Sequence, residues 1–109
     1  MFQENVNIIV QDLSDQPMTL AEYTELSIGQ IEQVITDSNI LDSSAVTLAG
    51  IPGHEVVYTG KQGLYDLKWM QVWTVKNDKA YVISYTAEVS SYPALLETVQ
   101  EMIDSFEIT

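Results

Sequence analysis

The chain has 109 residues, which fits a single domain, and 46% of them are hydrophobic, which is enough for a buried core. Sixteen acidic residues face four lysines and no arginine, so the formal net charge is -12. Because nucleic acids and anionic membranes are bound through Lys and Arg, this charge disfavours both as direct partners. There is no cysteine, which excludes disulfides, thiol catalysis and thiolate metal sites.

The chain shows no hydrophobic run that approaches the roughly 20 residues of a membrane-spanning helix. Met1 to Asn5 contain no basic region that leads into an apolar run. We therefore expect no signal peptide within this sequence.

The first predicted elements are a strand and a helix. Alternating apolar positions predict the strand over residues 5–12. Thr19 followed by Glu22 fits a capping box, which predicts that a helix begins there. Apolar residues then recur at helical spacing, so this helix is amphipathic and is expected to end near Thr36.

The middle of the chain reads as four strands joined by short turns. The strands are predicted over residues 41–49, 54–59, 64–76 and 79–87, with turns at 50–53, 60–63 and at Asn77-Asp78. A final amphipathic helix is expected after Ser90-Ser91, with Pro93 in its first turn. The order β-α-β-β-β-β-α predicts a single α+β domain over residues 1–109, with an antiparallel sheet covered by two helices.

Four aromatic residues stand out in the longest predicted hairpin. Trp69, Trp73, Tyr81 and Tyr85 occupy alternating positions, and we expect them to share one sheet face packed under a helix. The alternative is an exposed recognition surface, because Trp and Tyr dominate the energetics of binding interfaces.

The lysines suggest a place where a partner binds. All four lie between residues 61 and 79, whereas residues 1–60 carry no Lys or Arg. We expect an acidic protein partner to bind there, through Lys61, Lys68, Lys76, Lys79 and Trp73.

Residues with catalytic chemistry are sparse. His54 is the only histidine, and the acidic residues lie mostly on predicted solvent faces of helices. A zinc site would need three carboxylates, which is uncommon, and no calcium-loop spacing is present. We expect no enzyme activity, no catalytic residue, no metal site and no cofactor; a weak surface calcium site remains the open alternative.

Several short strings resemble the PsbP-type domain, a family that includes the extrinsic PsbP subunit of photosystem II and its prokaryotic relatives. A Ran-binding, Mog-type eukaryotic group is related to it. The strings cover nearly the whole chain, and they are residues 5–10, 19–23, 48–55, 68–73, 80–86 and 102–106.

This resemblance implies an α/β/α sandwich around an antiparallel sheet and a non-catalytic role in assembling or stabilising proteins. It also implies a location outside the cytoplasm: periplasmic, lumenal or secreted. The family opens with a further strand segment that precedes the start of this chain, so we expect an open sheet edge and a homodimer formed through it. The alternative function is a small-ligand or lipid-binding domain with a pocket between the sheet and the first helix; a hydrolase is least favoured.

Overall fold

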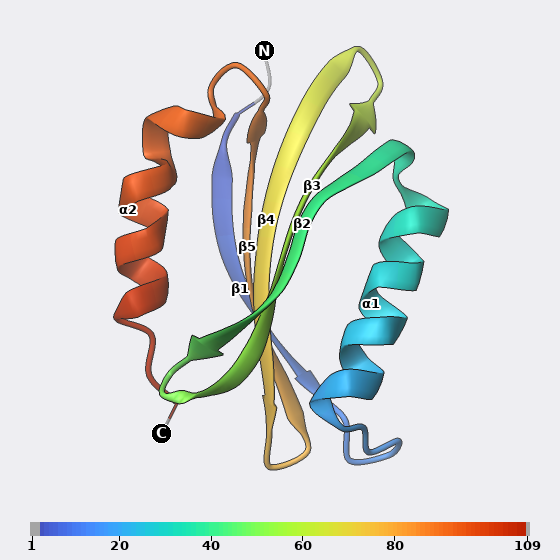
Figure 1. Ribbon diagram of the computed structural model, residues 1–109, viewed down its shortest axis with the longest axis vertical. Helices are drawn as coiled ribbons and strands as arrows, with labels where there is room; N and C mark the ends of the chain where they lie inside the picture. The colour runs from blue at the N-terminus through green and yellow to red at the C-terminus, as the bar shows by residue number, and fades with distance from the viewer. Residues whose placement is uncertain (1–2, 109) are drawn as a thin grey trace.

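A five-stranded antiparallel sheet forms the middle layer of the protein, with strand order β1-β5-β4-β3-β2. The computed structural model describes residues 3–108, so Met1 and Phe2, part of the segment in which we expect no signal peptide, lie outside it. One helix covers each face of the sheet (Figure 1), which confirms the predicted α+β sandwich. The elements are β1 (Asn5–Asp12), α1 (Leu20–Val34), β2 (Thr36–Leu48), β3 (Ile51–Gln62), β4 (Tyr65–Lys76), β5 (Lys79–Glu88) and α2 (Tyr92–Asp104).

Helix α1 begins where its capping box predicts. The Thr19 hydroxyl accepts a hydrogen bond from the Glu22 amide at 3.1 Å, and the Thr19 amide donates to a Glu22 carboxylate oxygen at 3.0 Å. These two bonds satisfy amides that the first turn of a helix leaves without partners. The bond from the Thr19 amide also lowers the pKa of the Glu22 carboxyl, because it stabilises the ionised form.

The β2–β3 hairpin is longer than the sequence pattern indicated. Its turn lies at Ala49 and Gly50, which have φ values of 54° and 78°, and Ile51 already belongs to β3. The predicted turn over residues 50–53 is therefore wrong from Ile51 onward. Gly53 is a buried strand residue whose missing side chain lets the backbone of β4 approach closely.

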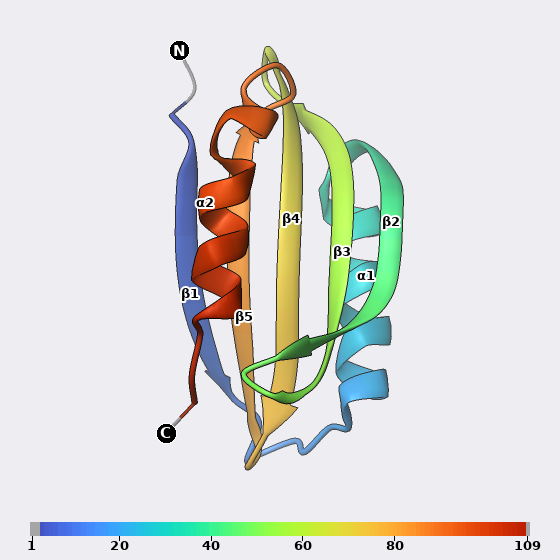
Figure 2. The ribbon, with the colours of Figure 1, turned by 60° about the vertical axis from the view of Figure 1, so that its left-hand side comes forward.

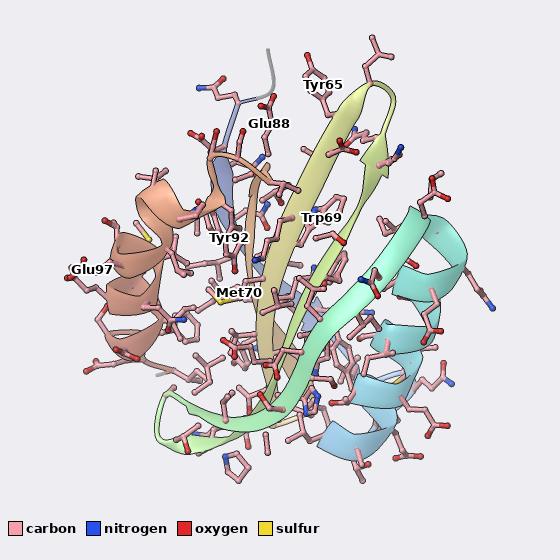
Figure 3. The ribbon with its side chains drawn as sticks, turned by 45° about the horizontal axis from the view of Figure 1, so that its top comes forward. Tyr65, Trp69, Met70, Glu88, Tyr92 and Glu97 are labelled. Atoms are coloured by element: carbon pink, nitrogen blue, oxygen red, sulfur yellow. The ribbon has the colours of Figure 1, made fainter. Side chains whose placement is uncertain are left out.

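The predicted single aromatic stripe is wrong, because the β4–β5 register divides it between the two sheet faces. Trp73 pairs with Val82 and Trp69 with Thr86, so odd positions of β4 share a face with even positions of β5. Figure 3 shows Trp69 and Met70 on opposite sides of β4, with Met70 on the same side as α2. The two tryptophans thus lie under α1, and Tyr85 lies under α2.

Two hydrophobic cores result, one on each face. Beneath α1, Tyr23 and Ile31 of the helix pack on Val56, Trp69 and Trp73 of the sheet. Beneath α2, Val99 and Ile103 pack on Met70, Val72 and Tyr85. The prediction that the aromatic residues are mostly scaffold is therefore right for Trp69, Trp73 and Tyr85, which are at most 9% exposed.

Candidate binding surfaces

The four lysines do not form one patch. Lys61 pairs with Asp66 near the β3–β4 turn, whereas Lys76 and Lys79 face each other beside the β4–β5 turn. These two turns lie at opposite ends of the 12-residue strand β4, which spans about 36 Å at about 3.3 Å per residue. Lysine-mediated binding of an acidic partner stays a prediction, and it would need two separate contacts.

Trp73 has almost no surface to offer a partner. Its side chain is 1% exposed, and its indole nitrogen donates a 2.8 Å hydrogen bond to the Thr24 hydroxyl of α1. The Tyr23 ring packs edge-on against it, and the His54 ring stacks on it with centroids 5.9 Å apart. The geometry therefore makes Trp73 a core residue that joins α1 to β4.

Lys68 lies on the other face of the sheet, at the start of α2. Its ammonium nitrogen is 4.4 Å from the centroid of the Tyr92 ring, a distance typical of a cation–π contact. Figure 3 shows the Tyr92 side chain between α2 and β4. Burial raises the pKa of Tyr92 to about 12, with a further contribution from the negative charge of Glu55, so this ring stays neutral.

A serine and the single histidine form a pair that the sequence did not reveal. The Ser43 hydroxyl and His54 Nε2 are 2.7 Å apart, because β2 and β3 pair Ser43 with Val56, which lies two residues after His54 on the same face. Within residues 3–108 no carboxylate bonds to the other ring nitrogen of His54, so nothing orients the imidazole as a base for Ser43. No three His, Asp or Glu side chains of that range gather as metal ligands.

Strand β1 presents the largest apolar surface of an edge strand in the protein. β1 and β2 form the two outer edges of the sheet (Figure 2). On β1, Ile8 is 57% exposed and Ile9 and Val10 are each 54% exposed. No lysine, proline or register shift interrupts the strand between Asn5 and Gln11. Such features are the usual protection of an edge, so β1 is open to pairing with another strand.

A cavity of about 330 Å³ lies between α1 and the sheet, where the sequence placed the pocket of its alternative function. Its floor includes Gln71, Trp73 and Val82, and Tyr23 and Ile31 of α1 form its wall. The Tyr58 hydroxyl donates to the Gln71 side-chain oxygen at 3.1 Å, and the Gln71 amide donates to the Ser84 hydroxyl at 3.2 Å. None of the described residues that line it is Asp, Glu, Lys, Arg or His.

Two solved structures are similar to this chain in fold. The protein of unknown function PA94 from Pseudomonas aeruginosa superposes with a TM-score of 0.82 at 12% identity, over 100% of this chain and 86% of that one. Cyanobacterial PsbP (CyanoP) from Synechocystis sp. PCC 6803 gives a TM-score of 0.68 at 13% identity, over 97% of this chain and 68% of that one. No protein-family model and no curated protein sequence matches the chain.

The fold is therefore PsbP-like, as the resemblance implied, and identities this low show the fold alone. Neither described helix has the length and apolar character to cross a membrane. The sequence pattern missed the polar network of the cavity and the Ser43–His54 pair. One signal for the network was available, because Gln71 stands between Trp69 and Trp73 on an otherwise apolar strand face.

Proposed function

We propose that this protein is a non-catalytic interaction module that associates with a second copy of itself through β1. The observation that carries the proposal is the exposed apolar edge formed by Ile8, Ile9 and Val10. A strand at a sheet edge has unpaired backbone N–H and C=O groups, which another strand can satisfy. The resemblance to the PsbP-type family, which implies a role in assembling or stabilising proteins, supports this kind of role as an analogy.

Self-pairing suits the side chains of β1. If two β1 strands meet antiparallel about a two-fold axis normal to the sheet, residues on the same face oppose one another. On the α2 side of β1 these are Val6, Ile8 and Val10, because their partners in β5 include Tyr85 and Ile83 of that face. A pairing centred on Ile8 would place Val6 beside Val10 of the second copy and form one continuous apolar strip.

The charge distribution favours the same edge. The chain has a net charge of -12, so two copies repel each other in most orientations. Residues 5–11 carry no charged side chain, whereas β2 carries Asp37 and Asp42. Docking β1 to β1 therefore brings no charged side chains face to face between Asn5 and Gln11, and Glu4 meets Asp12 of the second copy only at the two ends of the strand.

A non-catalytic role is proposed because the one nucleophile–base pair lacks the rest of a catalytic constellation. Ser43 is exposed to water, and the imidazole of His54 stacks on Trp73 with no orienting carboxylate among residues 3–108. A hydroxyl without an oriented base and a preorganised oxyanion site is a weak nucleophile.

Light scattering across about 10 µM to 1 mM protein tests the association, a range that covers dissociation constants typical of weak dimers. We expect a dimer fraction that rises with concentration, and a dissociation constant raised at least about 100-fold by Ile8→Lys, which opposes two charges at the two-fold axis and loses apolar burial. Leu41→Lys is the matched control, because Leu41 is 51% exposed on the opposite edge strand, and it should leave the dimer unchanged.

Salt distinguishes this association from binding through the lysines. Added salt should strengthen the dimer, because it screens the repulsion between two chains of net charge -12. Binding of an acidic partner through Lys61, Lys68, Lys76 and Lys79 should instead weaken with salt. A monomeric mass at the highest concentration would reject self-pairing, as would equal effects of Ile8→Lys and Leu41→Lys on the dissociation constant. Either result would leave β1 as an edge for a strand of a different protein.

A further inference from the structure

The cavity beneath α1 is electrically neutral inside a strongly acidic protein. Its titratable groups are Tyr23 and Tyr58, and burial raises the pKa of each phenol, to about 12 for Tyr58. Both therefore remain protonated at physiological pH. A charged ligand would lose its hydration on entering and find no opposite charge, which costs several kcal/mol by the usual order of magnitude.

Polar groups converge in the cavity from three strands and the helix. Besides the Tyr58–Gln71–Ser84 chain of hydrogen bonds, the Tyr23 hydroxyl donates to the Gln11 side-chain oxygen at 3.2 Å and so links α1 to β1. The Gln71 amide nitrogen carries two protons, of which Ser84 accepts one, and the Gln11 bond uses only that side chain's oxygen. Gln71 thus keeps one amide proton for a bound acceptor, whereas Gln11 lies two strands away in the sheet, at the rim of the cavity.

Size and surface restrict the occupant further. A volume of about 330 Å³ is at the lower end of the range for ligand pockets, which suits a molecule of one ring. Ile9, Val34 and Ile35 provide accessible apolar walls for such a ring, above a buried floor that includes Trp73 and Val82. An acyl chain is a poorer occupant, because it would cover the glutamine amides without giving them a hydrogen-bond partner.

We propose that this cavity is a binding site for a small uncharged molecule that combines one apolar ring with a carbonyl or amide group. The ring lies against the apolar walls of the cavity, and the carbonyl oxygen accepts from the free amide proton of Gln71. The site is separate from the proposed self-association, although β1 contributes Ile9 and Gln11 to its rim.

Three ligands of nearly the same shape test the proposal: benzamide, benzoate and benzamidine, which are neutral, negative and positive at pH 7. We expect about 10 mM benzamide, a concentration suited to a weak fragment, to shift the NMR signals of the Trp73 indole N–H and the Gln71 side-chain amide. The backbone amide of Val99, in the core on the opposite face, should not move. Benzoate should leave all three unchanged, and benzamidine should shift only signals of surface acidic residues.

The double variant Tyr58→Phe/Gln71→Leu removes the central hydrogen-bonding pair and keeps the size of both side chains. Removal of both partners at once leaves no orphaned group between them, and only the Ser84 hydroxyl loses a hydrogen bond, so the fold should be retained at a cost of about 1 kcal/mol. Benzamide should bind about tenfold more weakly, as expected for the loss of one hydrogen bond, while toluene binds at least as well as to the wild type. Both substitutions lie in β3 and β4, so they leave the β1 edge unchanged.

Several results would overturn the proposal without any need for the variant. Unchanged Trp73 and Gln71 signals in the folded wild type at saturating benzamide would do so. Equal shifts of those signals by benzoate and benzamide would show that neutrality does not govern the site. An unchanged benzamide affinity in the folded double variant would show that Gln71 does not hold the carbonyl.

Discussion

The two edge strands of the sheet differ in almost every property that governs strand pairing. β1 keeps one continuous register with β5 over all its residues, and it exposes three consecutive apolar side chains. β2 shifts register with β3 twice, between Thr36 and Asn39 and between Ile40 and Asp42. Asp37 has a positive φ of 53°, which bends β2 at its start.

This difference shows how one sheet can have one closed edge and one open edge. Bulges, a twisted backbone and acidic side chains make β2 a poor template for a further strand. Neither a bulge nor an acidic side chain occurs in β1 between Asn5 and Gln11. No charged side chain lies between Asn5 and Gln11, so in a chain of net charge -12 the open edge is also the less repulsive of the two edges.

The largest effect on stability should follow from disturbing the contact between β3, which carries the edge strand β2, and β4. A Cβ atom added at Gly53 would lie 2.6 Å from the backbone oxygen of Trp73, and neither backbone can yield easily. We expect Gly53→Ala to lower the free energy of unfolding by about 3 kcal/mol, as overpacking against a backbone does. Urea unfolding followed by fluorescence measures it. Gly63→Ala is the control, because its φ of 61° costs about 1 kcal/mol but no atom lies nearby; equal losses would contradict the steric argument.

An intermediate effect on stability should distinguish the part of β1 that packs beneath α2 from the part that is exposed at the sheet edge. Val6 packs partly buried against the core beneath α2, whereas Ile8 is 57% exposed. Val6→Ala should lower stability by about 1 kcal/mol through lost apolar burial, and Ile8→Ala by less than about 0.5 kcal/mol in the monomer. Thermal or urea unfolding at low protein concentration checks both values. A larger loss from Ile8→Ala would mean that β1 is not an exposed edge in solution.

The smallest effect should appear as a pH dependence on the β2 side. Burial, and secondly the charge of Asp42, raises the pKa of Glu55 in the folded protein. Ionised Glu55 therefore opposes folding; this cost is absent below the ordinary pKa and develops as pH rises through the raised pKa. Because the group is partly exposed, we expect Glu55→Gln to stabilise the protein at pH 7 by roughly 0.5 kcal/mol. Urea unfolding at pH 4 and pH 7 should show the gain only at pH 7, and a gain at both would contradict it.

Local signals in the sequence identified most elements and some boundaries. The bounds of β1 and the start of α1 follow from apolar alternation and from the Thr19–Glu22 capping box, both of which act over a few residues. The early part of β2 was missed, because Asp37, Ser38 and Asn39 are typical turn residues. Pairing with β3 supplies partners for that backbone, and a local pattern does not contain this information.

The division of the aromatic residues shows a different kind of limit. A two-residue turn at Asn77-Asp78 pairs Lys76 with Lys79, so an odd position always faces an even one across this hairpin. The turn at Asn77-Asp78 was predicted correctly. Because it pairs odd positions of β4 with even positions of β5, it also places Trp73 and Tyr85 on opposite faces of the sheet. The facing of the two strands is therefore encoded locally in the turn, whereas the alternation within each strand does not contain it.

By itself the sequence determined that this is an acidic α+β domain without thiol chemistry, with two amphipathic helices that cover an antiparallel sheet. Those properties depend on composition and on periodicities of a few residues. Only the tertiary structure decided which strand became the open edge, that the lysines lie apart, and that Gln11, Gln71 and Tyr58 meet in a neutral cavity. The physical reason is that strand order and register bring together residues from opposite ends of the chain, such as Ile9 and Val82, which have no local interaction to indicate their contact.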